Sequence, residues 1–333
     1  MGDGISRREF VKKLGAATAG IAAAAGVAAD NTVGAAVGGG TASAQTRPEK
    51  TPNVNFPRAP RERLAVAAWP FRAYIDSPTN SDRDPNKPGM DLKDFGAYVV
   101  KTFDVNGIEP YNLHFSSTTP EYLGRFRNAV AKAGAHAVNI AVDQEKSFYD
   151  GDRATRQAAV AYAKKWIDVA VAIESPSIRT NLAPAKNTAP NLANAIESMK
   201  EVASYGASRN VVVHMENDNL VSEDAFFIVK IIEGVNNPYL HALPDFANSM
   251  MSGDADFAYR AIEAMFENSY GICHVKDGDF AQNGKDYPID LEKTFGILKA
   301  NGYRGYCSIE YSGGGDPHEP TKKLIAESVG YLE

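Results

Sequence analysis

Four residues that could hold a cation stand at the ends of four apolar runs in the C-terminal half of the chain. They are Glu216, Asp245, His274 and Glu310. Charged side chains are rarely buried unless they are paired or bind a metal. Three converging carboxylates would repel one another, and a divalent cation removes that conflict. Three oxygen donors and one imidazole predict one divalent metal ion, Mn, Co or Mg first, with Zn or Fe as alternatives.

The elements that must position these residues alternate along the chain from Leu64 onward. Several apolar runs are nearly continuous, as in parallel strands that are covered on both faces. The predicted strands are 64–69, 107–111, 137–142, 177–181, 210–216, 240–245, 270–275 and 306–310. The predicted helices between and after them are 91–103, 120–132, 152–172, 190–205, 222–234, 255–266, 290–300 and 320–332. Eight strands, each followed by a helix, predict an α/β fold, a single-domain (β/α)8 TIM barrel over residues 64–333.

Such a barrel carries its active site at the C-terminal ends of the strands, which places the four residues on one face. The longest insertion, 72–90, follows the first strand and could cover the barrel mouth. Gly134, Gly206 and Gly302 follow predicted helix ends, where a left-handed cap is common.

The first 44 residues resemble a twin-arginine export signal. Arg7-Arg8 and Phe10 precede a weakly apolar Ala/Gly-rich run and the sequence Ala42-Ser43-Ala44. A membrane anchor is the less favoured alternative, because the run is short of strongly apolar residues. Residues 45–63 are polar and rich in proline, which predicts a linker or an arm lying on the domain. A periplasmic or secreted protein is therefore expected, with no stable membrane insertion after removal of the signal.

The net charge and the cysteine content limit the partners and cross-links that are expected. The formal net charge is −6, and the excess of acid falls after the export signal, so nucleic acid is an unfavourable partner. Only two cysteines are present, Cys273 and Cys307, and no disulfide framework follows from them. Cys273 and Cys307 stand at different distances before the neighbouring predicted ligands, so the two cysteines are expected at different heights of the barrel. This offset predicts two buried thiols that point away from the site and form no disulfide bond.

The ligand series resembles that of the xylose-isomerase-like barrels, the sugar (phosphate) isomerase/epimerase group. The most specific segments are 272–277, Ile-Cys-His-Val-Lys-Asp, which is close to that group's H-x-K-D strand, and 308–311, Ser-Ile-Glu-Tyr, which is close to its final strand. The resemblance implies that Glu216 and Glu310 bind the metal and exchange protons at the substrate carbon. Asp245 and His274 would be the other ligands, and a homo-oligomer is a further expectation. The family often has a second histidine three residues after the aspartate, where this chain has Asn248.

Chemistry alone supports the same assignment. A metal on a carbonyl and its neighbouring hydroxyl stabilises an enediolate, and two carboxylates can move protons on its two faces. This predicts an isomerase or epimerase of a sugar or polyol. The same residues could expel or add water, so a lyase, dehydratase or hydratase acting on an oxidised (keto) sugar or glycoside stays open. A non-catalytic sugar-binding barrel is a third alternative. A related DNA-repair endonuclease would need more histidines and a basic face.

Further residues could line the pocket. The candidate substrate contacts are Trp69, Glu109, Arg179, Asn181, His214, Asn248 and Lys276. Arg179 and Asn181 share side-chain parity on one strand, and His214 shares parity with Glu216. Loop residues His114 and His318 could also reach the site.

Overall fold

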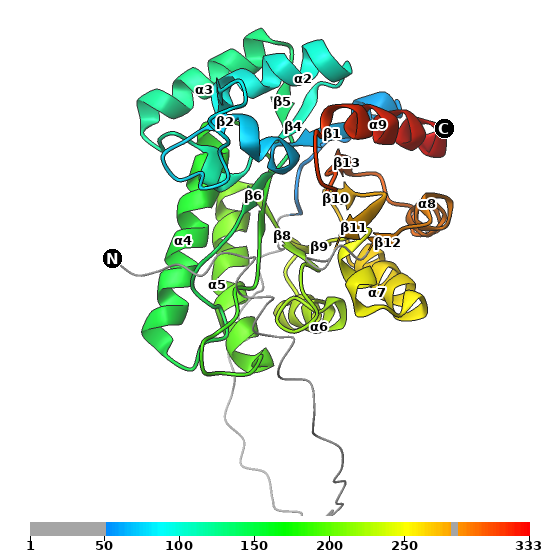
Figure 1. Cartoon of the computed structure of the whole chain (residues 1–333). Helices are drawn as coiled ribbons and strands as arrows, with labels where there is room; N and C mark the ends of the chain where they lie inside the picture. Colours follow the sequence, from blue (N-terminus) through cyan, green and yellow to red (C-terminus); the bar gives the residue numbers. More distant parts are fainter. Residues whose placement is uncertain (1–50, 281–285) are drawn as a thin grey trace, which may run out of the picture. The chain divides into compact units, whose positions relative to one another are not determined.

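The computed structural model describes residues 51–280 and 286–333, whose parallel strands form a barrel (Figure 1). The export-signal prediction lies outside these residues. The barrel strands are β1 (Leu64–Ala67), β4 (Gly107–Glu109), β5 (His136–Ala137) continued by β6 (Ile140–Val142), β7 (Ser177–Thr180), β8 (Val212–Glu216), β9 (Leu240–Leu243), β10 (Ile272–Val275) and β13 (Tyr306–Ile309). They pair in two parallel sheets, ordered β10-β13-β1-β4-β5 and β6-β7-β8-β9.

The two sheets close into one ring through isolated parallel bridges. Tyr111 pairs with Ala141, which joins β4 to β6, and Asp245 pairs with His274, which joins β9 to β10. The fold is thus the predicted single-domain (β/α)8 barrel. The second bridge also places two of the predicted metal ligands side by side.

Helices cover the outside of the strands (Figure 1). They are α2 (Phe95–Phe103), α3 (Pro120–Lys132), α4 (Arg153–Ala172), α5 (Leu192–Arg209), α6 (Ala225–Val235), α7 (Ala255–Glu267), α8 (Leu291–Ala300) and α9 (His318–Leu332). Side chains of Thr119, Asp152, Asp224, Asp254 and Asp290 cap α3, α4, α6, α7 and α8. Each side-chain oxygen accepts a hydrogen bond from a backbone N–H that has no partner inside the helix, so these residues fix where the helices begin.

Short elements decorate the loops. They are the 3-10 turns η1 (Arg61–Arg63), η2 (Trp69–Tyr74), η3 (Leu92–Asp94), η4 (Asn112–His114) and η5 (Asn248–Ser252), the parallel pair β2 (Ile75–Asp76) and β3 (Met90–Asp91), and the antiparallel pair β11 (Gly278–Phe280) and β12 (Asp286–Pro288). The β2–β3 pair frames the predicted insertion after β1, and β11 follows the end of β10. Neither pair was predicted, because each strand has only two or three residues.

One predicted helix end was wrong. Helix α5 continues to Arg209, and Asn210 supplies the left-handed C-cap with φ 57°. Gly206 lies inside the helix, where a Cβ would come within 2.6 Å of the carbonyl oxygen of Val211. This glycine is therefore explained by the close approach of β8, whereas Gly134 and Gly302 have the expected positive φ.

The barrel floor, where the strands begin, is closed by the segment 51–57, which lies against it. The ring of Phe56 makes edge contacts with Tyr270 and Tyr306, with centroids 5.3 and 5.7 Å apart. The hydroxyls of Tyr239 and Tyr270 donate to the carbonyls of Thr51 and Pro52. Phe56 also packs against a small cluster of buried residues, Ala65, Val138, Leu243, Ile272 and Tyr306, which is separate from the main core. Segment 51–57 thus completes the interior of the barrel from below.

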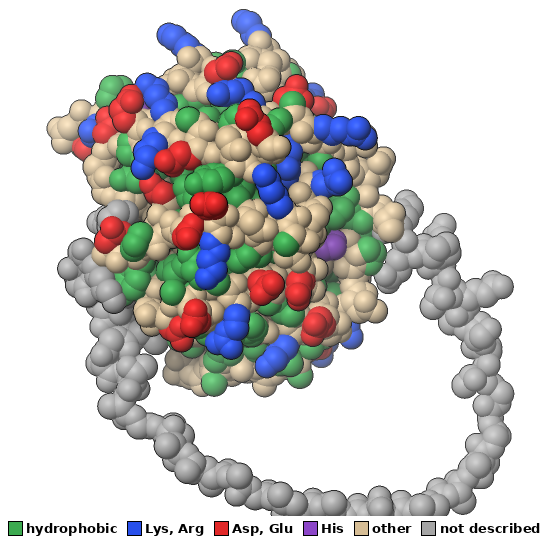
Figure 2. Space-filling model, turned by 90° about the vertical axis from the view of Figure 1, so that its right-hand side faces the viewer, with side chains coloured by type: hydrophobic (Ala, Val, Ile, Leu, Met, Phe, Trp, Pro, Cys, Tyr) green, Lys and Arg blue, Asp and Glu red, His purple; other side chains and the backbone are tan. Residues whose placement is uncertain are grey.

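The surface carries charges of both signs. On the face shown in Figure 2, lysine, arginine, aspartate and glutamate side chains are interspersed rather than gathered into a basic field. Within the residues described, no helix combines the length and the apolar character that crossing a membrane would need.

Candidate metal centre

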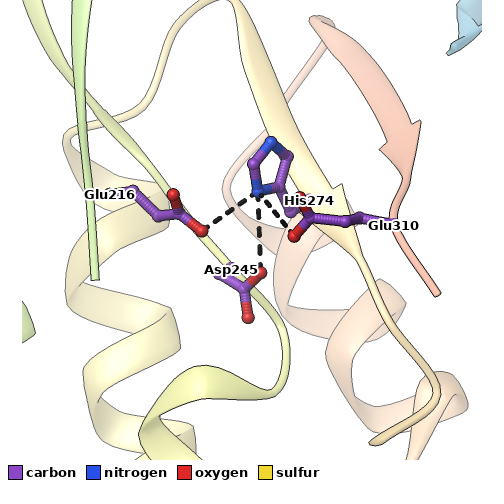
Figure 3. A group of neighbouring side chains, drawn as sticks. All are labelled: Glu216, Asp245, His274 and Glu310. Carbon is purple, nitrogen blue, oxygen red and sulfur yellow. Dashed lines mark hydrogen bonds and ion pairs between the residues drawn. The ribbon is translucent and has the colours of Figure 1, made fainter. Parts of the chain in front are cut away.

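The four predicted ligands meet at the barrel mouth, where the strands end. Glu216, Asp245, His274 and Glu310 are all buried, and each offers one ligand atom within 4.8 Å of the others. Nδ1 of His274 lies 3.1 Å from a carboxylate oxygen of Glu216, 3.3 Å from Glu310 and 3.7 Å from Asp245 (Figure 3). The imidazole edge therefore faces all three carboxylates at once.

Strand register explains why residues at different depths of their strands converge. His274 lies opposite Ser308 and Val275 opposite Ile309, so Glu310 stands beyond the last paired residue of β13. Its backbone N–H donates to Val275 O at 3.0 Å, which keeps Glu310 at the rim. Ligands from strand interiors and strand ends thus reach one point.

The same register corrects the expected offset of the cysteines. Cys273 lies directly opposite Cys307, and the two sulfur atoms are 3.7 Å apart. Both are buried free thiols, as predicted, but they are direct neighbours. The error arose from counting back from the ligands, because the ligands themselves do not occupy matching rows.

Two buried cations balance the carboxylates. Lys276 Nζ lies 3.0 Å from Asp245 and 3.1 Å from Glu310, and Arg179 Nε lies 2.9 Å from Glu216. Asn248 joins the two halves of the cluster, because its amide nitrogen donates to Glu216 and its oxygen accepts from Lys276. Every charge at the centre therefore has a partner of opposite sign.

These neighbours separate the protonation behaviour of the two glutamates. Burial raises the pKa of Glu216, but Arg179 and His274 outweigh burial and hold that pKa well below its ordinary value. Burial also raises the pKa of Glu310, and there it prevails over the charges of His274 and Lys276. Two carboxyl groups with pKa values pushed apart are suited to act as a base and an acid.

The donor set fits a divalent cation. Oδ2 of Asp245 and Oε2 of Glu216 are buried and accept no hydrogen bond from the described residues, and they form ion pairs with Lys276 and Arg179. Oδ1 of Asp245, by contrast, accepts from the backbone N–H groups of Ala247 and Asn248, which fixes the carboxylate. A fixed carboxylate with one oxygen aimed into a cluster of three other ligands could bind a metal ion.

Glu109, predicted to contact substrate, lies instead beneath the cluster. Its side chain is 1% exposed, and its carboxylate contacts Nε2 of His274 at 3.0 and 3.1 Å. Ser308 and Asn139 donate to it at 2.6 and 2.7 Å. Ser177 in turn donates to Asn139. Glu109 therefore touches the far edge of the ligand histidine rather than the open mouth.

His214, also predicted to contact substrate, lies toward the floor. It is fully buried, its Nε2 accepts from the backbone N–H of Gly271, and it lies at a small hollow that Val54 and Phe56 of segment 51–57 also line. His214 and Glu216 share one side of β8, as predicted, but His214 comes two residues earlier on the strand and so lies nearer the floor. The structure therefore brings His214 to the floor and not to the four ligands at the mouth.

The remaining candidates lie around the mouth. Trp69 is half-buried, and the Arg72 guanidinium stacks on it at 3.8 Å from the ring centroid. Asn181 accepts a hydrogen bond from the backbone of Gln144, which ties two loops together. Arg179 also pairs with Asp143 at 2.6 Å. Trp69, Asn181 and Arg179 thus lie at or next to the C-terminal ends of β1 and β7.

The two loop histidines take different places. His114 is buried beside the Tyr111 ring, and burial, aided by Arg72, lowers its pKa to about 3. His318 contacts Tyr98 and Asp316 and packs against the ring of Phe71, so it joins α9 to α2 rather than reaching the centre.

Sequence reasoning missed the polar residues beneath the ligands. Asn139, Ser177 and Ser308 face the barrel interior, where they hold Glu109 directly or through one another. The signal that could have found them is parity, because Ser308 precedes Glu310 by two residues and shares its face.

Comparison with known proteins identifies the family. A family model described as the Xylose isomerase-like TIM barrel matches residues 97–333. The chain belongs to this family. A search of curated proteins by sequence gave no match.

Solved structures share the fold at low identity. D-allulose 3-epimerase from Methylomonas sp. superposes with a TM-score of 0.60 at 16% identity, covering 84% of this chain and 99% of that one. A 3-keto-D-glucoside 4-epimerase from E. coli gives 0.58 at 13% identity, covering 80% and 98%. A xylose isomerase-like barrel from Mycobacterium smegmatis, in complex with magnesium, gives 0.58 at 16% identity, covering 81% and 97%.

Proposed function

We propose that the chain is a metal-dependent isomerase or epimerase of a sugar or polyol. The observation that carries the proposal is the convergence of Glu216, Asp245, His274 and Glu310 within 4.8 Å at the barrel mouth. The family and its sugar-epimerase neighbours support the same reaction class. Mn, Co or Mg is the proposed ion, and the neighbour that holds magnesium supports a hard divalent cation.

Glu216 and Glu310 are the proposed acid/base pair. Glu216 stays ionised beside Arg179 and can accept the proton next to the substrate carbonyl, while Glu310, whose pKa is raised by burial, can hold a proton and deliver it. A bound divalent cation would supply Lewis acidity that stabilises the charge of the enediolate. Asn248 and Lys276 are proposed to orient the substrate oxygens, because Asn248 contacts Glu216, Lys276 contacts Asp245 and Glu310, and the two side chains contact each other.

The first experiment is elemental analysis of the purified protein with an Asp245→Ala control. About one equivalent of Mn, Co or Mg in the native chain, lost in the control, supports the centre. A panel of free ketoses and aldoses then tests turnover by chromatography. A native chain that neither contains nor takes up metal would refute the metal-dependent reaction and favour a non-catalytic sugar-binding barrel.

A lyase, dehydratase or hydratase acting on a keto sugar or glycoside is the second candidate, and Asn248 is the observation that favours it. An amide that donates to Glu216 and accepts from Lys276 cannot carry a proton, so it leaves the Lys276 ammonium as the proton donor nearest to Glu310. Loss or gain of one water, measured as a mass change of the substrate, separates this reaction from isomerisation, which leaves the mass unchanged.

We also propose export by the twin-arginine route, on the Arg7-Arg8 pair and the apolar run that follows it. That route carries folded cargo, so a metal could be loaded before export. Fractionation of cells that express the native chain or an Arg7→Lys, Arg8→Lys variant tests it. Equal amounts of both outside the cytoplasm would refute the proposal.

A further inference from the structure

The ligand histidine has two ring nitrogens at opposite edges, and the two edges meet different carboxylates. Nδ1 of His274 faces the predicted metal ligands, while Nε2 lies 3.0 Å from Glu109. A single ion cannot lie at both edges of one ring, so Glu109 cannot share an ion that binds Nδ1. Glu109 therefore contacts the ring directly, at hydrogen-bond distance from Nε2, and not through the ion.

Glu109 is itself held rigidly. Its two oxygens accept from Asn139 and Ser308, and its side chain is 1% exposed, so it has one position on β4. Both ring nitrogens face carboxylates, but a metal ion held by Glu216, Asp245 and Glu310 would need the lone pair of Nδ1. The proton of a neutral imidazole would then lie on Nε2, where the Glu109 carboxylate can accept it.

We propose that Glu109 is a positioning residue that fixes the orientation and tautomer of His274, so that Nδ1 is presented to the metal, and that Ser308 acts through Glu109. The inference rests on the proposed metal-dependent function. Outer carboxylates of this kind raise the affinity of a histidine site for metal about 10- to 100-fold. Glu109 therefore contributes to the site without touching metal or substrate.

The test is Mn²⁺ affinity by equilibrium dialysis of the full chain after removal of metal by a chelator. Glu109→Gln, which keeps the volume, is expected to weaken affinity about tenfold or more. Ser308→Ala, which removes one hydrogen bond to Glu109, is expected to weaken it several-fold. The matched control is Glu223→Gln, a change to a glutamate that is equally buried, at 2% exposed, but lies in the loop between β8 and α6; it is expected to leave affinity unchanged.

The double variant Glu109→Gln, Ser308→Ala decides whether the two residues act together. If Ser308 acts through Glu109, the double variant binds Mn²⁺ no more weakly than Glu109→Gln alone. Fully additive losses would overturn that link. A second readout is ¹⁵N NMR of the histidines in the Zn²⁺-loaded protein, in which the His274 proton is expected on Nε2 in the native chain.

Each remaining outcome decides the matter. Native affinity in a folded Glu109→Gln variant overturns the inference while leaving the proposed function in place. If that variant does not fold, an unchanged affinity in Ser308→Ala overturns it instead. A native chain that binds no metal overturns the proposed function and this inference together.

Discussion

Two histidines inside the same barrel are equally buried but have pKa values shifted in opposite directions. His214 on β8 and His274 on β10 are both 0% exposed. At the floor, burial lowers the pKa of His214 to about 3, and the nearby His241 adds to that effect. At the mouth, burial also lowers the pKa of His274, but Glu109, Glu310 and Glu216 outweigh it and raise that pKa well above the ordinary value.

The difference reflects the different surroundings at the two ends of the barrel. The interior at the floor is an apolar cluster, and Phe56 of segment 51–57 packs against it. The mouth concentrates charge, which costs desolvation and is offset only by pairing. Changes at the floor are expected to act on folding stability, and changes at the mouth on metal and chemistry. The predictions that follow aim to break that separation.

The largest effect is expected from Glu310→Gln at the mouth. Loss of a general acid or base typically lowers turnover about 10²- to 10⁴-fold, and this variant also loses a metal ligand. Turnover of the best substrate in the sugar panel is the measurement, with thermal unfolding as the control for folding. Full turnover in a folded variant would remove Glu310 from the reaction.

At the floor, Phe56→Ala is expected to lower the free energy of unfolding by about 2 to 3 kcal/mol. Truncating a buried Phe costs about 3 to 5 kcal/mol, and Phe56 is only half-buried, although it makes two edge contacts with tyrosines. Urea unfolding measures the loss, and Phe56→Leu should recover most of it. A tenfold change in Mn²⁺ affinity in Phe56→Ala would show that floor and mouth are coupled.

Lys276→Gln is expected to strengthen metal binding at the mouth, whereas the loss of a ligand weakens it. The ammonium contacts Asp245 and Glu310, so it competes with a metal ion for their oxygens. Removing its charge should raise Mn²⁺ affinity about tenfold, or roughly 1.4 kcal/mol. Equilibrium dialysis checks this. Weaker binding would mean that Lys276 serves mainly to hold the two carboxylates in place.

The sequence was sufficient to predict the barrel, since the eight barrel strands and the eight helices of the described residues are those expected from apolar periodicity and caps, with ends shifted by a few residues. The meeting of the four predicted ligands also followed, because strand ends share one face of a barrel. Strand parity gave the side of the sheet correctly for His214.

Depth along the barrel did not follow from the sequence. Parity says that Glu109 and His214 point inward, but the register between strands decides which layer each enters. That register depends on how the ring of strands staggers as it closes, which is a property of all the strands together. The same missing information misplaced the cysteines relative to each other, although both are buried free thiols as predicted.

The smallest predicted effect tests the floor histidine through pH. The pKa of His214 is about 3 in the folded chain and about 6.5 when unfolded, so the unfolded state binds more protons between these values. The stability due to neutral His214 is complete above pH 6.5 and is lost as pH falls toward 3. His214→Gln keeps an acceptor for the Gly271 N–H but cannot be protonated.

Between pH 6 and pH 5 the native chain should therefore lose about 1 kcal/mol more stability than His214→Gln. Urea unfolding of both proteins at pH 5, 6, 7 and 8 measures the difference, and the interval from pH 7 to 8 is the internal control, where the difference should stay constant. Equal pH dependence in the two proteins would mean that His214 gains a proton inside the folded barrel. In that case the floor would share the electrostatics of the mouth, and the contrast between the two histidines would fail.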